Sequence, residues 1–147
     1  MKLSRSQISK LFFSAKDYKE FSSSLEKAGF VKNLDGINKH VFIHPEWHWV
    51  VKLAHGFNKA PRAGAKVNKF YLPHCECGTR RFEDMYDGYT VFGADVQLLF
   101  QRKVERVGDY DLYQNFSAQL CQKRIYGWDS HENNVGLLGK RTVIIDY

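Results

Sequence analysis

The sequence is poor in cysteine and has no long apolar run. Its 147 residues contain three cysteines, and no stretch approaches the roughly 20 apolar residues of a membrane-spanning helix. An odd number of cysteines argues against a disulfide framework and fits a reducing cytosol. The opening residues, MKLSRSQISKLFF, have no apolar core followed by a small-residue cleavage site, so we expect no signal peptide. We therefore expect a cytoplasmic protein that does not span a membrane.

Acidic residues are also scarce. The chain has 16 Asp and Glu against 22 Lys and Arg, a formal net charge of +6. This excess favours acidic partners, namely nucleotide phosphates, nucleic acid or an acidic protein, without choosing among them. An apolar content of 44% and an aromatic content of 15% indicate a globular chain. The length suits one domain with a real core and is short for two, so we expect a single domain over 1–147.

The N-terminal half predicts helix followed by sheet. Apolar residues recur at helical spacing over 4–28, with a break near Ser14–Ala15 and Gly29 after the last turn. From Phe30 the period changes, and three strands joined by short connections are expected, ending with Trp49 to Leu53. A hairpin follows over 81–92, because Asp87-Gly88 separates two strand-forming runs.

The C-terminal half predicts two helices and a second hairpin. Apolar spacing favours helices over 95–105 and 109–125, with Asp95 and Asp109 as N-caps. A polar loop then leads into a strand at 135–137, a Gly-Lys turn and a strand at 142–145 that ends on Asp146. A loop that feeds a hairpin brings Asp129, Asn134 and Asp146 to one end of it. Such oxygen ligands suit divalent cations, and a free carboxylate can orient an attacking hydroxyl, as phosphoryl transfer requires.

The pattern D-x-H-x-x-N, a strand, a turn and then hydrophobic-I-D resembles the catalytic loop and metal-binding strand of the protein kinase-like fold. The D-x-H form is closer to aminoglycoside and small-molecule kinases, and to kinases carried by bacteriophages, than to eukaryotic kinases. The resemblance implies an α+β chain with a five-stranded antiparallel N-lobe sheet in 1–92. A truncated helical C-lobe with a catalytic-loop hairpin would occupy 93–147. It gives Asp129 the role of catalytic base, and Asn134 and Asp146 the role of Mg²⁺ ligands.

The same resemblance implies an ATP site on the sheet. Val50-Val51-Lys52-Leu53 is similar to the third strand of the family, whose lysine pairs with nucleotide phosphate oxygens. Gly36 and Lys39 fall in the turn that would cover the phosphates, and 93–95 falls at the hinge that contacts adenine. Lys52 is expected to pair with phosphate directly or to be held by Asp146.

The sequence departs from the family in three places. The phosphate-covering turn has one glycine, Gly36, where several are usual. No acid lies between Lys52 and Glu76, and neither Glu76 nor Glu83 lies in a predicted helix, so the usual helix glutamate is missing. The sequence ends one residue after Asp146, where ordinary protein kinases continue into an activation loop. We therefore expect a minimal kinase whose substrate docks by another surface, a nucleotide-binding half of the fold, or a chain whose missing surface a partner protein supplies.

The cluster His74-Cys75-Glu76-Cys77-Gly78 invites a zinc interpretation. Cys-x-Cys is not the usual Cys-x₂₋₄-Cys spacing, and no second pair follows, so we favour a surface loop with unpaired thiols.

Two hypotheses follow for the function. The first is an ATP- and Mg²⁺-dependent phosphotransferase, a minimal Ser/Thr protein kinase of phage type that acts on host proteins, with Lys52 and Asp129 as catalytic residues. The second is a kinase-like binding protein that inhibits a host protein stoichiometrically. Nucleic-acid binding through the basic stretches 59–69 and 101–106 is a weaker third interpretation. The substrate and the oligomeric state are left open.

Overall fold

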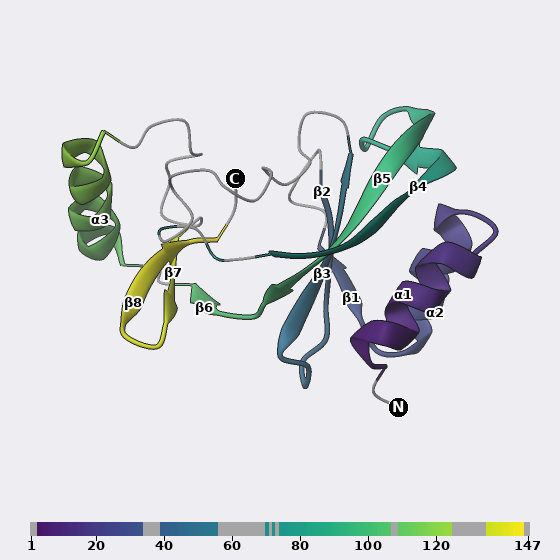
Figure 1. The fold of residues 1–147 in the computed structure, drawn as a ribbon, viewed down its shortest axis with the longest axis horizontal. Helices are drawn as coiled ribbons and strands as arrows, with labels where there is room; N and C mark the ends of the chain where they lie inside the picture. Colours follow the sequence, from purple (N-terminus) through teal and green to yellow (C-terminus); the bar gives the residue numbers. More distant parts are fainter. Residues whose placement is uncertain are drawn as a thin grey trace. The chain divides into compact units, whose positions relative to one another are not determined.

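The structure is a computed structural model that describes residues 3–33, 39–55, 70, 72, 74–106, 109–124 and 135–145. These residues form three helices and eight strands, an α+β architecture (Figure 1). The chain divides into two compact units. The first comprises Met1–Ala60 and His74–Lys103, and the second comprises Pro61–Pro73 and Val104–Tyr147. The expected single domain with parts 1–92 and 93–147 stays a prediction.

The first unit contains a five-stranded antiparallel sheet, which confirms that part of the expected fold. Its strands are β1 Val31–Asn33, β2 Lys39–Ile43, β3 Trp49–His55, β4 His74–Tyr86 and β5 Val91–Arg102. The order across the sheet is β1-β2-β3-β5-β4, so the first three strands form the predicted meander. The β4–β5 hairpin turns at Asp87, where the sequence predicts it, and β5 lies between β3 and β4.

Two helices precede the sheet, with the break between them close to the predicted one. They are α1 Arg5–Ser14 and α2 Tyr18–Lys27. Ser4 and Gln7 form a reciprocal capping box at the start of α1, with bonds of 2.7 and 3.1 Å. The Asp17 carboxylate accepts a 2.8 Å bond from the Glu20 N–H and so begins α2. The two helices run along one face of the sheet (Figure 1).

Side chains of strand β4 bind the end of α1 and the beginning of α2. The Arg80 guanidinium donates to the Phe12 and Ala15 carbonyls at 2.9 and 2.6 Å, where α1 has unpaired acceptors. The Asp84 carboxylate accepts from the Tyr18 and Lys19 N–H groups at 2.8 and 3.0 Å, where α2 has unpaired donors. One strand therefore satisfies the end of one helix and the beginning of the next.

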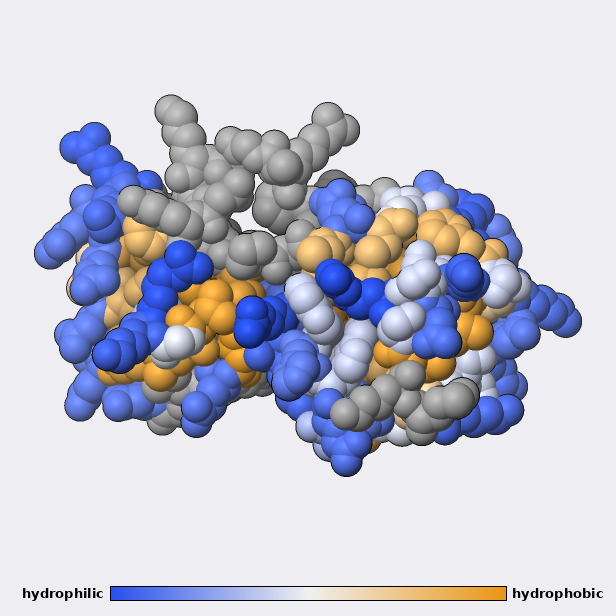
Figure 2. All heavy atoms as spheres, turned by 60° about the horizontal axis from the view of Figure 1, so that its bottom comes forward, coloured by the Kyte–Doolittle hydropathy of each residue, from blue (hydrophilic) through white to orange (hydrophobic). Residues whose placement is uncertain are grey.

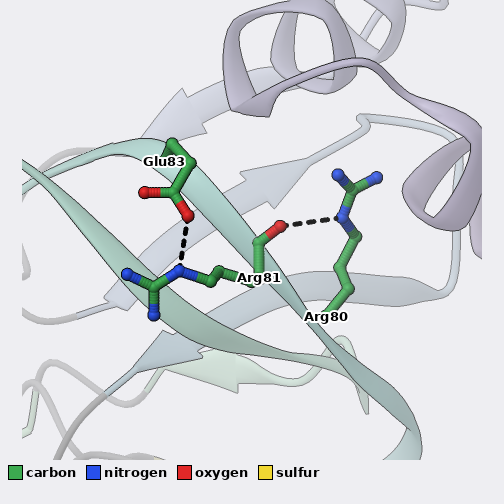
Figure 3. Close-up of polar contacts among 3 residues, drawn as sticks. All are labelled: Arg80, Arg81 and Glu83. Carbon is green, nitrogen blue, oxygen red and sulfur yellow. Dashed lines mark hydrogen bonds and ion pairs between the residues drawn. The ribbon is translucent and has the colours of Figure 1, made fainter.

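The two faces of the sheet differ in chemistry. Alternate residues of a strand point to opposite faces, and residues opposite each other in register share a face. The helix-covered face is apolar, and its fully buried side chains include Phe12, Phe21, Phe42, Val51, Leu53, Phe82, Leu98 and Phe100. The opposite face carries Lys52 and the pair Arg81–Glu83. Figure 3 shows Arg80 extending toward the helices, on the other side of β4 from that pair.

Three predictions about this unit are wrong. Residues 93–95 are not a hinge and 95–105 are not a helix, because β5 runs without a break from Val91 to Arg102. A continuous apolar run does not distinguish a buried strand from a helix, and here pairing on both sides, with β3 and β4, decides for strand. The 74–78 cluster is not a surface loop, since it forms the start of β4. The chain leaves this unit after Lys103.

The second unit contains a three-stranded sheet and one helix. Its elements are β6 Glu105–Arg106, α3 Tyr110–Gln122, β7 Val135–Leu138 and β8 Arg141–Ile144. The predicted helix over 109–125 and its Asp109 N-cap are confirmed, and so is the hairpin with its Gly-Lys turn. Gly139 has a φ of +65°, which favours glycine in this tight turn. Phe116, Leu120, Val135 and Ile144 form the core.

Strand β8 has a further backbone partner that lies far away in sequence. The Ile144 N–H donates to the Phe70 carbonyl at 2.7 Å, and the Leu72 N–H donates to the Ile144 carbonyl at 2.9 Å. The chain segment that precedes β4 therefore pairs with the last strand of the second unit.

Candidate functional site

The candidate site is the sheet face that carries Lys52. Lys52 lies in the middle of β3, in register with Val41 of β2 and Leu99 of β5. Its side chain is only 5% exposed. A lysine is rarely buried unless its ammonium has partners, so a buried lysine on a central strand is a candidate functional group. The sequence predicted this residue, and the structure confirms its strand and its apolar neighbours.

Two buried glutamines flank Lys52 on the neighbouring strand. Gln97 and Gln101 lie two residues before and after Leu99, and both therefore share the face of Lys52. They are 9% and 1% exposed. Diagonal neighbours across two strands are within reach of long side chains, and each carboxamide offers both a donor and an acceptor. Sequence reasoning missed this pair because residues 95–105 were assigned to a helix.

An apolar row lies next to Lys52 on the same face. Val31, Ile43 and Val50 are in register across β1, β2 and β3, and Val50 is two residues from Lys52. A groove of about 410 Å³ opens beside this row and is lined by Val31, Lys32, Ile43 and Pro45. Pockets of this size with mostly apolar walls suit a flat aromatic ring. The groove thus lies at the β1–β2 side of the sheet, and the buried Lys52 lies on β3, the next strand.

One acid lies in the same row as Lys52. Glu76 of β4 is in register with Leu99, which in turn is in register with Lys52. Two strand spacings separate Glu76 from Lys52, about 10 Å between their Cα atoms. The sequence offered Glu76 as a late and poorly placed partner for the lysine. The structure puts it on a strand rather than a helix, with an exposed side chain.

The other predicted site residues fall mostly outside the described part of the chain. Gly36, Asp129, Asn134 and Asp146 all lie there, and of Lys39 only the backbone, in β2, is described. Their assigned roles stay predictions. Val135 is in register with Ile144, so the described neighbours of Asn134 and Asp146 lie at the same end of the hairpin. Within the described residues, no group of three or more His, Cys, Asp or Glu side chains could hold a metal ion.

A second polar cluster, which the sequence did not reveal, lies under the helices. His40 is 4% exposed; its Nδ1 lies 2.6 Å from the Tyr18 hydroxyl and its Nε2 lies 3.0 Å from the Tyr86 carbonyl. Because a carbonyl can only accept, Nε2 carries the proton and Nδ1 accepts from Tyr18. The Lys32 ammonium donates to the Tyr86 hydroxyl and lies 4.8 and 4.4 Å from the Tyr18 and Tyr86 ring centroids.

Burial sets the protonation of this cluster. It lowers the pKa of His40 from 6.5 to about 4, and the nearby Lys32 and His55 add to that effect. Burial also raises the pKa of the Tyr18 hydroxyl, with Tyr86 contributing. A neutral imidazole that is hydrogen-bonded on both sides braces strand β2 against α2 and β4. This cluster is therefore a structural one, on the face opposite to Lys52.

Comparison of the chain with protein-family models, with curated proteins and with solved structures gave no match. None of the described helices is long and apolar enough to cross a membrane. Figure 2 shows hydrophobic residues that reach the surface among hydrophilic ones on the face drawn. Among the residues that the structure describes, the exposed large apolar side chains are Phe13, Val31, Tyr89, Val91 and Tyr110. Function must therefore be argued from the site.

Proposed function

We propose that the chain is an ATP- and Mg²⁺-dependent phosphotransferase of the protein kinase-like type. In its most specific form it is a minimal Ser/Thr protein kinase of phage type that acts on host proteins. The observation that carries the proposal is the buried Lys52 on the third strand of a five-stranded antiparallel sheet. The apolar groove beside β1 and β2 adds a place for the base, and the net charge of +6 favours an anionic ligand.

Each group has a physical role in this proposal. The Lys52 ammonium neutralises phosphate charge from a site shielded by its neighbours, where an electrostatic interaction is stronger than in water. Asn134 and Asp146 supply oxygen ligands to Mg²⁺, and Asp129 orients the attacking hydroxyl of a serine or threonine. Positioning and charge stabilisation carry the rate, since phosphoryl transfer asks little covalent chemistry of the protein.

A radiolabelled-ATP assay tests the proposal. The protein is incubated with labelled ATP and Mg²⁺, alone and with a bacterial lysate, and label on protein is measured. Asp129→Asn should lower transfer by about 10²- to 10⁴-fold while ATP affinity, measured by calorimetry, is largely kept. Lys52→Met should weaken ATP binding by about 10- to 100-fold, the loss of a charge-assisted hydrogen bond. Lys140→Met removes the same charge from an exposed turn and should leave both unchanged.

Persistent label in Asp146→Ala contradicts the assigned metal site. Equal ATP affinity of the wild type and Lys52→Met contradicts the assigned phosphate site. Circular dichroism of each variant separates these outcomes from unfolding.

A stoichiometric inhibitor of a host protein is the second candidate. The observation that favours it is the tip of the β4–β5 hairpin, where Tyr89 is 92% and Val91 68% exposed. Exposed apolar side chains close together are typical of interaction surfaces. The inhibitor hypothesis would be preferred if neither the wild type nor any variant transferred label to protein, and if a host protein bound the wild type tightly but did not bind Tyr89→Ser.

A further inference from the structure

Two thiols lie together at an irregularity of strand β4. Cys75 is in register with Phe100 and Gly78 with Leu98, so the strand carries one extra residue at this β-bulge. Gly78 has a φ of +130°, which favours glycine and lets the strand bend. Cys75 is exposed and Cys77 is half-buried against the core on the helix side, and both are free thiols.

The bulge places the two cysteines where a bend of the strand would allow a bond between them. Residues two apart on a regular strand have Cα atoms about 6.6 Å apart, within the range of about 4.4 to 6.8 Å found in disulfides, but their Cβ atoms are equally far apart and a disulfide needs about 3.5 to 4.5 Å. The bond therefore requires the strand to tighten at the bulge, where Gly78 lets it bend. The Cys77 Sγ lies 4.0 Å from the Cys75 carbonyl oxygen, so it points back along the strand. Burial and the neighbouring Cys75 raise the pKa of the Cys77 thiol. Cys77 is therefore the poorer initial nucleophile of the two, and Cys75 is the one that solvent reaches.

A fixed cation lies beside the exposed thiol. The Arg5 Nη1 is 3.8 Å from the Cys75 Sγ, and the Arg5 guanidinium carbon lies 4.3 Å from the Trp49 ring centroid. Stacking on the indole holds the guanidinium in place. A small anionic reagent that approaches Cys75 is attracted by this charge, and a cationic one is repelled.

We propose that Cys75 and Cys77 form a redox-active thiol pair that reacts with an anionic low-molecular-weight disulfide such as glutathione disulfide. The Cys75 thiolate attacks one sulfur of glutathione disulfide, the S–S bond breaks, and one glutathione thiolate leaves with the electron pair. The Cys77 thiolate then attacks the Cys75 sulfur, and the second glutathione leaves. Two protein thiols are oxidised to one disulfide, one glutathione disulfide is reduced to two glutathiones, and the two thiol protons pass to solvent or to the departing thiolates.

The proposed bond would change the surroundings of Cys75 and of Glu76. Oxidation removes the Cys75 thiol as the partner of Arg5, whose guanidinium keeps its contact with the Trp49 ring. The disulfide ring also encloses the backbone of Glu76, whose side chain points to the face of Lys52. The chemistry itself does not depend on the phosphotransferase proposal.

Peptide mapping of the wild-type protein tests the pair directly. After treatment with glutathione disulfide, mass spectrometry should find an internal disulfide in the peptide that contains Cys75 and Cys77. In Cys77→Ser the same treatment should leave glutathione on Cys75, because the second attack is missing. Cys121, also exposed, serves as the internal control in every sample. Wild-type protein in which glutathione remains on Cys75, or in which only Cys121 reacts, overturns the proposal.

The role of Arg5 is tested with reagents of different charge. At low ionic strength the anionic glutathione disulfide should modify Cys75 about threefold faster than the neutral hydroxyethyl disulfide, relative to Cys121 with each reagent. The cationic cystamine should be slower than both. Arg5→Gln should remove this ranking and leave the rate at Cys121 unchanged. A ranking that survives in Arg5→Gln shows that this arginine does not select the reagent.

Discussion

Acidification should weaken the first unit through one buried side chain, His40. The imidazole is neutral in the folded state, with Nδ1 accepting from Tyr18 and Nε2–H donating to Tyr86. Its pKa is lowered from 6.5 to about 4, first by burial, with Lys32 and His55 as the nearby charges. The unfolded chain therefore binds more protons than the folded one as the pH falls below 6.5. Stability is fully present above that value and is lost toward pH 4.

The size of the effect follows from the two pKa values. With 6.5 in the unfolded and about 4 in the folded state, the free energy of unfolding falls by about 2 kcal/mol near pH 5 and about 3 kcal/mol near pH 4. The side chain is 4% exposed, so screening by solvent does not reduce this figure much. The pKa of His55 is also lowered by burial, with Asp87 opposing, and His55 adds to the loss in the same pH range.

Urea denaturation of the wild type and of His40→Gln between about pH 7 and pH 4 isolates the contribution of His40 to the pH dependence of the unfolding free energy. Gln keeps a donor for the Tyr86 carbonyl and does not titrate, so its unfolding free energy should fall less than the wild type's by about 2 kcal/mol near pH 5. Shared changes from carboxylates and from His55 cancel in the comparison. An NMR titration of the His40 ring gives the folded-state pKa directly. A midpoint near 6.5, or parallel pH profiles for the two proteins, would refute the reasoning.

Three further changes test how β4 holds the helices, all by urea unfolding at neutral pH. Gly78→Ala should cost about 1 to 2 kcal/mol, because alanine is strained at a φ of +130° and its Cβ would lie 2.7 Å from the tip of the exposed Phe13 ring, which must turn aside. Gly88→Ala, strained but in open space, should cost about 1 kcal/mol, and equal costs would show that the Phe13 contact adds nothing. Asp84→Ala should cost about 2 kcal/mol, since two N–H groups of α2 lose their acceptor; an unchanged midpoint would show that water replaces it. Arg80→Ala should cost about 1 to 2 kcal/mol and speed amide exchange at the end of α1; unaltered exchange there would contradict the bond.

The local elements could be predicted where short-range chemistry decides them. Asp109 accepts from the first turn of a helix, and Asp87-Gly88 is a turn signal. Both act within a few residues of their own position. Lys52 was recognised for a similar reason, as one charge inside an apolar strand.

The predictions were wrong where pairing with strands remote in sequence determines the secondary structure. The run from Val96 to Gln101 is buried on both faces, so it has no alternation to mark it as a strand. Its strand form depends on β3 and β4, which are remote in sequence. For the same reason the sequence did not predict that Gln97 and Gln101 of β5 lie beside Lys52. The polar cluster around His40 likewise joins residues 22 and 46 positions away from it.

The path of the chain has a consequence for dissection of the protein. Phe70 and Leu72 pair with β8 in the second unit, yet β4, which follows them, returns to the first. The chain thus passes from the first unit to the second, returns to the first and then enters the second again, so neither unit is one continuous stretch of sequence. A fragment that stops at Lys103 carries residues 70–72 without their strand partner, and one that starts at Val104 lacks them. A single cut in the gene therefore cannot give two fragments that each contain one whole unit.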